Sequence, residues 1–413
     1  MGSEQMPLRR NRQFQRLVVA KVSNELSSAM GTVALPLVVL LSTESATLAG
    51  AALFCSSAAL VVMQVIGGAI TDRLRADRTL RLSSLVQACG WALVLVATLT
   101  PDLLVPLVLV GATVAGAASG LDGPSEFALL KALVPQEQFG RATAVGQGRE
   151  AAAGLAGGPV AGALVAAASF VPFAIQTMLH LLATIVTPRR PAQEREHRNA
   201  TFLGDVIEGF RIVIRDSGLR GIAIVTGIAN FPVVALPLTL IAYYQDTGVS
   251  PLLIGIFSSA FGVGMLCGAA LAGPLSSRFR LGALGIFGIG VFAMGQVAIV
   301  VTHASFWVTC AVLVLAALPL PSFNAAVGAY TTAITPEHLV GRIVAATGVP
   351  GMILMPVGSL AAGVLYDRFG AVVPLAVSAT TAGLAAVTMW MTRSLRTIPR
   401  IDELEEGVFE QRC

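Results

Sequence analysis

The chain has 413 residues, of which 55% are hydrophobic and only 12% are charged. A soluble domain carries about 25% charged residues, so this composition excludes an ordinary soluble protein and indicates a membrane protein. The formal net charge is +4, but the basic residues gather in the tails and short loops. This excess reflects membrane topology, and we expect no nucleic-acid partner.

Twelve apolar segments of membrane-crossing length follow one another along the chain. A hydrocarbon core about 30 Å thick needs about 20 residues of helix, and a spanning backbone must satisfy its own hydrogen bonds. The sequence therefore predicts an all-α integral membrane protein with twelve transmembrane helices. The predicted spans are 15–42, 47–71, 80–99, 103–131, 142–167, 169–187, 217–244, 251–275, 282–302, 305–333, 343–366 and 370–392.

A charged stretch in the middle of the chain divides these spans into two sets of six. Within it, residues 202–213 have apolar positions at helical spacing with charges between them, which predicts a helix on the inner membrane surface. The predicted organisation is a cytoplasmic tail at 1–14, a six-helix half at 15–187, a cytoplasmic linker at 188–216, a six-helix half at 217–392 and a cytoplasmic tail at 393–413.

The loop between the second and third spans is rich in arginine. It carries Gly68, Asp72, Arg73 and Arg78 between two uncharged segments. Loops with excess Lys and Arg are retained in the cytoplasm, so this loop and both termini are expected on the cytoplasmic face of a plasma (inner) membrane, as in a bacterium.

The two halves of the chain repeat each other. The sequence 33–37 recurs at 234–238, and 133–141 recurs in altered form at 334–342, both 201 positions later. The pattern Gly68-x-x-x-Asp72-Arg73 recurs as Gly273-x-x-x-Ser277-Arg278, 205 positions later. Six spans fused to six in one orientation make a parallel repeat, whose substrate site is expected between the halves near the bilayer midplane.

These residues resemble the major facilitator superfamily. The loop at 68–78 matches its signature between spans 2 and 3, and Gly154-x-x-x-Gly158-Pro159-x-x-Gly162 in span 5 is similar to its antiporter signature. Residues 124–142 and 208–220 look more narrowly like the macrolide-efflux and enterobactin-exporter branch. The chain departs from the pattern in lacking an arginine in span 4 and in carrying Ser277 at the second copy of the loop.

The resemblance implies a conformational latch at the loop. Asp72 would cap the N-terminus of span 11 near Gly341, and Arg73 would pair with Asp122 or Glu126 at the inner end of span 4. The predicted latch residues are Gly68, Asp72, Arg73, Arg78 and Arg278. The alternative is a positive loop that marks topology alone.

The span-5 signature is expected to act as a hinge or seal between the halves. Its residues are Gly154, Gly158, Pro159 and Gly162. These glycines could also simply let helices approach closely, and the two interpretations overlap.

Ionisable residues inside the spans are candidates for proton coupling, because a charge at that depth is costly. Glu25 in span 1 is the first choice, and its alternative is an ion pair with Lys21 on the same helix face. Asp122, Glu126 and Glu150 lie near Arg149 in the inner parts of spans 4 and 5. They form either a structural charge cluster or a proton relay.

Further residues are predicted to line the substrate cavity, namely Asn24, Pro36, Phe231, Pro237, Asn324 and Met355. His180 is interpreted as a satisfied residue of helix packing. Asp367 and Arg368 are interpreted as interface residues at the outer end of span 11.

No Gly-x-x-x-x-Gly-Lys-Ser/Thr sequence is present, and His and Cys do not occur at metal-ligand spacing. We therefore expect no enzyme activity, no metal and no cofactor besides a proton gradient. The sequence predicts a monomeric secondary transporter in a lipid bilayer that exports hydrophobic or amphipathic small molecules by alternating access. The alternatives are an importer on the same fold and a membrane sensor.

Overall fold

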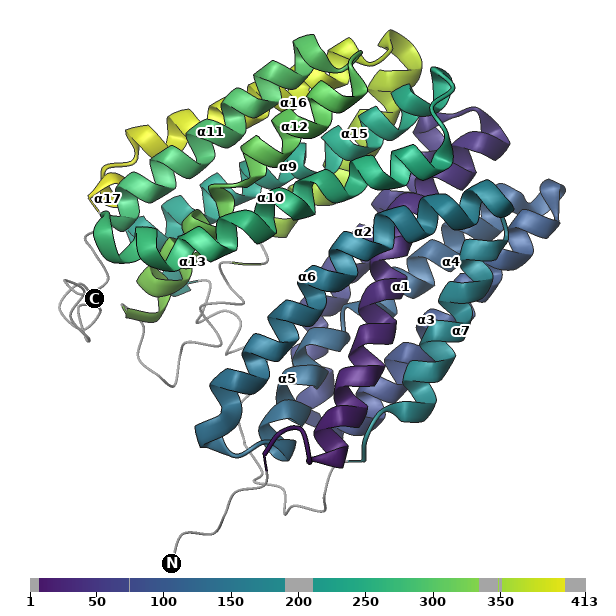
Figure 1. Cartoon of the computed structure of the whole chain (residues 1–413), viewed down its shortest axis with the longest axis horizontal. Coiled ribbons are helices and arrows are strands. Elements are labelled where there is room, and N and C mark those ends of the chain that lie inside the picture. The colour runs from purple at the N-terminus through teal and green to yellow at the C-terminus, as the bar shows by residue number, and fades with distance from the viewer. Residues whose placement is uncertain (1–6, 74, 190–210, 334–347, 349–350, 398–413) are drawn as a thin grey trace, which may run out of the picture. The chain divides into compact units, whose positions relative to one another are not determined.

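The protein is described here from a computed structural model that defines residues 7–73, 75–189, 211–333, 348 and 351–397 (Figure 1). Within the helices, the side chains at 68–73, 276–277, 329 and 332–333 are outside this description. The regular secondary structure of the described residues is entirely helical. Of the predicted surface helix at 202–213 only 211–213 are described, and of the two predicted tails only 7–14 and 393–397 are described.

The first half of the chain folds into long helices joined by short turns. They are α1 (Arg12–Thr43), α2 (Ala46–Arg73), α3 (Ala76–Leu99), a 3-10 turn η1 (Pro101–Leu103), α4 (Leu104–Ser119), α5 (Asp122–Leu133), α6 (Gln136–Ala167) and α7 (Val171–Val186). Asn11 begins α1 as an N-cap, because its side-chain oxygen accepts from the backbone N–H groups of Gln13 and Phe14.

The second half follows the same order. Its described helices are α9 (Ser217–Asp246), α10 (Pro251–Arg278), α11 (Leu281–Thr302), α12 (Phe306–Ala317), α13 (Leu320–Ala333), α15 (Leu354–Phe369), α16 (Val372–Met391) and a short α17 (Arg393–Arg396).

Ten stretches of the described residues are long and apolar enough to cross a membrane, and α7 is a shorter apolar helix. Two predicted spans are each built from two helices. The span at 103–131 breaks at Gly120, between α4 and α5, and the span at 305–333 breaks at Leu318–Pro319, between α12 and α13. Pro319 has no backbone N–H, so one helical hydrogen bond is missing at the second break.

The described helices belong to two compact units. The first comprises Met1–Glu44, Ala51–His197 and Thr247–Ser259, and the second comprises Ser45–Gly50, Arg198–Asp246 and Ala260–Cys413. The helix α2 therefore begins in the second unit, and α10 begins in the first.

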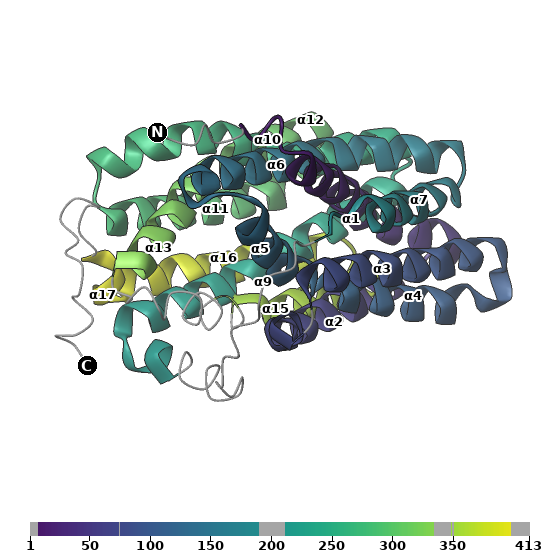
Figure 2. The same ribbon diagram turned by 90° about the horizontal axis from the view of Figure 1, so that it is seen from below.

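Each unit has a core of small and branched side chains. In the first unit α3 packs beside α4 and α7, and α1 packs beside α6 and α7 (Figures 1 and 2). In the second unit α9 packs against α15 and α16, and α16 also packs against α11. Large apolar side chains such as Ile185 and Val301 are 74% and 79% exposed, as expected of helix faces that contact lipid rather than water.

Candidate functional site

The first unit contains a cavity of about 420 Å³. Its volume lies within the range of small-molecule sites, about 300–1,000 Å³. Its apolar lining includes Leu35, Leu53, Leu60 and Trp91. The polar lining comes from α1, α2, α3, α4, α5 and α6 and includes Lys21, Asn24, Glu25, Ser28, Thr32, Ser56, Gln87, Ser119, Asp122, Glu126 and Glu150. All four acids predicted for proton coupling therefore line one cavity.

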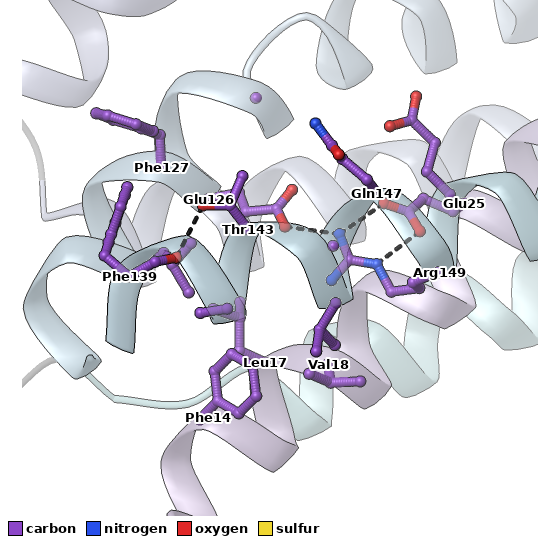
Figure 3. A pocket seen from close by; sticks show the side chains of 16 residues that line it. Phe14, Leu17, Val18, Glu25, Glu126, Phe127, Phe139, Thr143, Gln147 and Arg149 are labelled. Carbon is purple, nitrogen blue, oxygen red and sulfur yellow. Dashed lines mark hydrogen bonds and ion pairs between the residues drawn. The ribbon is translucent and has the colours of Figure 1, made fainter. Parts of the chain in front are cut away.

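Arg149 is the centre of a charged cluster that includes Lys21, Glu25 and Glu126 of this lining; Figure 3 shows Arg149 with Glu25 and Glu126. Its Nε and Nη2 atoms donate to the two carboxylate oxygens of Glu25, both at 2.7 Å. Its Nη2 atom also donates to Oε1 of Glu126 at 2.6 Å. The other oxygen of Glu126 lies 3.0 Å from Nζ of Lys21. Three helices, α1, α5 and α6, thus hold two cations and two carboxylates in one connected cluster.

The chain builds this cluster from residues far apart in sequence. Lys21 and Glu25 lie one turn apart on α1, Glu126 is on α5 and Arg149 is on α6. The side chains of Arg149 and Lys21 are only 8% and 6% exposed. Buried charges are tolerated when they are paired and hydrogen-bonded, and these four charges sum to zero.

Lys21 was the predicted alternative partner of Glu25. It forms its ion pair with Glu126 instead, and Glu25 binds Arg149. The spacing of Lys21 and Glu25 allows a pair on one helix face, but the guanidinium offers Glu25 two parallel hydrogen bonds, which is the stronger geometry.

A second hollow of about 300 Å³ lies among α1, α5 and α6 (Figure 3). It shares Glu25, Glu126 and Glu150 with the larger cavity. Arg149 lines only the smaller hollow, and Lys21 lines only the larger one. The four paired charges therefore form a wall shared by the two hollows, and its two carboxylates line both of them.

Asp122 is held differently from the other acids. Its carboxylate accepts from the hydroxyl of Ser83 at 2.5 Å and from the amide of Gln87 at 3.2 Å. No cation is paired with Asp122 among the side chains that the structure describes. Its predicted partner Arg73 has no described side chain, so that pairing stays a prediction. Glu150 is exposed and lines both hollows.

The polar face of α3 was not identified from the sequence. Ser83, Ser84 and Gln87 fall at helical spacing in an otherwise apolar span, and all three are buried. Polar residues inside a span usually face the protein interior, and this spacing could have revealed them.

Asn24 joins this polar face to α7. Its amide donates to Oγ of Ser84 at 2.9 Å, and its carbonyl oxygen lies 3.0 Å from Nδ1 of His180. Because Asn24 presents its carbonyl oxygen to His180, Nδ1 of His180 is the proton donor in this contact. His180 is thus partly satisfied, since its Nε2 has no hydrogen-bond partner among the described residues. Asn24 is 2% exposed and lines the larger cavity, and its part in a substrate site stays a prediction.

The remaining predicted cavity residues lie elsewhere in the helices. Pro36 is buried in α1 without interrupting it, whereas Phe231, Pro237 and Met355 are half-buried in the second unit and Asn324 is exposed. None of the five lines either of the two hollows described above. Their role in a cavity stays a prediction.

The span-5 glycines do not all serve one purpose. A Cβ atom on Gly158 would lie 2.6 Å from the carbonyl oxygen of Gly255, and one on Gly162 would overlap that of Pro251. A Cβ on Gly154 would meet no atom within 4 Å. Gly158 and Gly162 thus allow α6 to lie directly against the start of α10 within the first unit, and Pro159 continues α6 between them.

The predicted latch falls largely on undescribed side chains. Gly68, Asp72 and Arg73 lie in the last turns of α2, and the position near Gly341 is outside the described residues. Arg78 at the start of α3 and Arg278 at the end of α10 are exposed. The latch therefore stays a prediction.

The helices, their apolar exterior and the cavity define an all-α, multi-pass membrane protein with a small-molecule-sized site. The profile of the Major Facilitator Superfamily matches residues 17–244 and 221–410. The chain belongs to this superfamily of transporters, which confirms the predicted fold class and the resemblance. Macrolide efflux protein A of Streptococcus pyogenes is 23% identical over 316 residues, which cover 73% of this chain and 76% of that protein.

Solved structures share the fold. A D-xylose–proton symporter is 14% identical, with a TM-score of 0.71 over 95% of this chain and 99% of that one. A bacterial homologue of the human lysosomal transporter Spinster is 15% identical, with a TM-score of 0.70 over 96% and 98% of the two chains. A bacterial homologue of the iron transporter ferroportin is 15% identical, with a TM-score of 0.70 over 94% of this chain and 99% of that one. At these identities the likeness concerns the fold alone.

Proposed function

We propose that this transporter exports hydrophobic or amphipathic small molecules in exchange for protons, by alternating access of its two six-helix halves. It would act as a monomer in a bacterial plasma membrane, with both termini in the cytoplasm and no cofactor besides the proton gradient. The relative named for macrolide efflux and the glycine signature of α6 support export. The observation that carries proton coupling is the Glu25–Arg149 pair between the two hollows.

The proton would bind Glu25. Protonation removes the negative charge of Glu25 that attracts Arg149, and it therefore weakens both hydrogen bonds between the two side chains. Arg149 would then remain on Glu126, and the wall between the hollows would loosen on the Glu25 side. In this proposal the conformation that exposes Glu25 to the external, more acidic solution also has the higher proton affinity of the two conformations. Such a difference in affinity is what shifts a two-state equilibrium.

The substrate would lie in the larger cavity. Trp91 and the leucines Leu35, Leu53 and Leu60 offer an apolar surface, and four acids line the same cavity. This combination suits a molecule with an extended apolar body and a polar or basic group. Macrolides, for which the streptococcal relative is named, have this character.

The test is proton-driven uptake into inverted membrane vesicles, with a panel of macrolides and lipophilic cations. Glu25→Gln should abolish the dependence of uptake on the pH gradient. Glu44→Gln is the matched control, because Glu44 is an exposed glutamate at the other end of the same helix. Unchanged gradient-driven uptake by Glu25→Gln would eliminate Glu25 as the coupling carboxylate. Cells that lose the protein and then accumulate less of a substrate would indicate import.

A further inference from the structure

The N-terminus of α2 is capped by a residue from α15. Oδ1 of Asp367 accepts from the backbone N–H of Ala46 at 2.8 Å, and Oδ2 accepts from the N–H of Thr47 at 2.8 Å and the hydroxyl of Ser45 at 2.9 Å. Ser45 itself accepts from the N–H of Leu48 at 3.2 Å. The first N–H groups of a helix have no partners within it and favour a negative charge. Asp367 therefore completes a cap that Ser45 supplies only in part.

Backbone packing accompanies this cap. A Cβ atom on Gly50 would lie 2.5 Å from the carbonyl oxygen of Ser359, and one on Gly363 would overlap the carbonyl oxygen of Ala46. Ala46 and Ala49 are 1% and 0% exposed. The first turns of α2 thus lie directly on α15, and all of these residues belong to the second unit.

The internal repeat contains the same contact a second time. Gly50 corresponds to Gly255, 205 positions later, and the α15 residues Ser359 and Gly363 correspond to Gly158 and Gly162, 201 positions earlier. Gly158, Gly162 and Gly255 make the close contact of α6 with α10 in the first unit.

The acid is present in only one copy. The position that corresponds to Asp367 is Ala166, which is exposed, and the position that corresponds to Ala46 is Pro251. Proline has no N–H to offer a cap. The packing is therefore common to both repeats, whereas the charged cap is specific to α2 and α15.

We propose that Asp367 is a positioning residue for transport that holds the start of α2 on α15 in one conformation of the cycle. The helix α2 starts in the second unit and continues in the first, so any movement of one unit against the other must act on its first turns. Asp72 is predicted to cap the start of span 11, whose described part is α15. Span 2 and span 11 would then each carry, at the end of the span, an acid for the start of the other.

The two caps would alternate, because the ends of a pair of rocking helices open in turn. The Asp367 cap would close the end away from the arginine-rich loop. This inference rests on the proposed alternating-access function, although the cap can be tested without a substrate.

The test is the reaction of a buried cysteine with a water-soluble maleimide. In purified protein lacking its five native cysteines, Ala49→Cys should react slowly, since Ala49 is fully buried in the first turn of α2. Adding Asp367→Asn should raise the labelling rate about tenfold, the factor expected when a helix cap is lost. Asp367→Glu keeps the charge and should restore most of the protection. Ala166→Asn, at the corresponding position of the other repeat, should leave labelling unchanged.

An unchanged rate with Asp367→Asn would overturn the proposal. Ala385→Cys provides the second readout, because Ala385 is fully buried in the core of the second unit. An equal rise at both cysteines would mean general loosening and would also overturn it. A rise in the labelling rate at Ala49→Cys alone supports the cap. If vesicles then showed no export, the proposed transport function would be refuted, whereas the cap would stand.

Discussion

Replacement of Arg149 by methionine should be among the most destabilising single changes in the first unit. Met preserves much of the apolar stem but leaves Glu25 and Glu126 with one cation, Lys21, in place of two. Removing one partner of a buried ion pair costs about 3–5 kcal/mol. The side chains of Glu25 and Glu126 are 17% and 22% exposed, so partial solvation favours the lower end of that range. At about 2–4 °C per kcal/mol, the melting temperature should fall by about 10 °C.

The charge count also predicts a rescue. Adding Glu25→Gln to Arg149→Met leaves Glu126 paired with Lys21 and restores neutrality, so the double variant should regain about 2 kcal/mol. Arg141→Met is the control, because Arg141 is an exposed arginine on the same helix. The assay is thermal unfolding of purified protein in detergent. Equal melting temperatures for Arg149→Met and Arg141→Met, or a double variant less stable than Arg149→Met, would refute the reasoning.

Three further predictions concern other parts of the molecule. Gly162→Ala should lower the melting temperature by several degrees, because its methyl group would overlap the carbonyl oxygen of Pro251. Gly154→Ala is the control, because its methyl group meets open space, and it should be neutral or mildly stabilising. Equal melting temperatures for the two variants would contradict the close contact. Asp122→Asn should preserve the fold, since Ser83 and Gln87 can still form hydrogen bonds with an amide. Its gradient-driven uptake in vesicles should exceed that of Glu25→Gln. Lower uptake by Asp122→Asn than by Glu25→Gln would instead indicate Asp122 as the proton site. Burial would raise the pKa of Asp367, but the hydrogen bonds from residues 45–47 outweigh it and hold the pKa below its ordinary value. The cap is therefore present above the ordinary carboxyl pKa of about 3.9 and is lost only as the pH falls through the lower value. Because the thiolate is the reacting species, the labelling rate of Ala49→Cys is divided by that of a free thiol at the same pH. This ratio should be constant from about pH 8 to 5.5; a rise in the ratio as the pH falls over that interval would contradict it.

Most of the fold could be predicted from the sequence, because the hydropathy pattern that indicates a membrane helix is local to each segment. Uncharged runs of membrane length predict helices wherever they occur, and the positions of α1, α2, α3, α9 and α10 follow the runs closely. The breaks at Gly120 and at Leu318–Pro319 were missed, since a hydropathy pattern is continuous across them and membrane helices often tolerate glycine and proline.

The sequence predicted which residues form the charged site but not how they pair. Glu25, Glu126 and Arg149 were recognised because ionisable residues stand out in apolar spans. Their pairing was not, because the neighbour visible in the sequence, Lys21, competes with an arginine 124 positions from Glu25. The role of Asp367 was hidden for the same reason, since its partners at 45–47 lie on a helix more than 300 residues away.

The neutrality of the four-charge wall has an electrical consequence. One proton on Glu25 gives the cluster a charge of +1, and the site returns to zero when that proton leaves. If each proton is exchanged for one molecule, export of a monocation moves no net charge, while export of an uncharged molecule carries current. The membrane potential should then drive uncharged substrates and leave singly charged ones unaffected, so the same pump would discriminate between them by voltage even where both fit its cavity equally well.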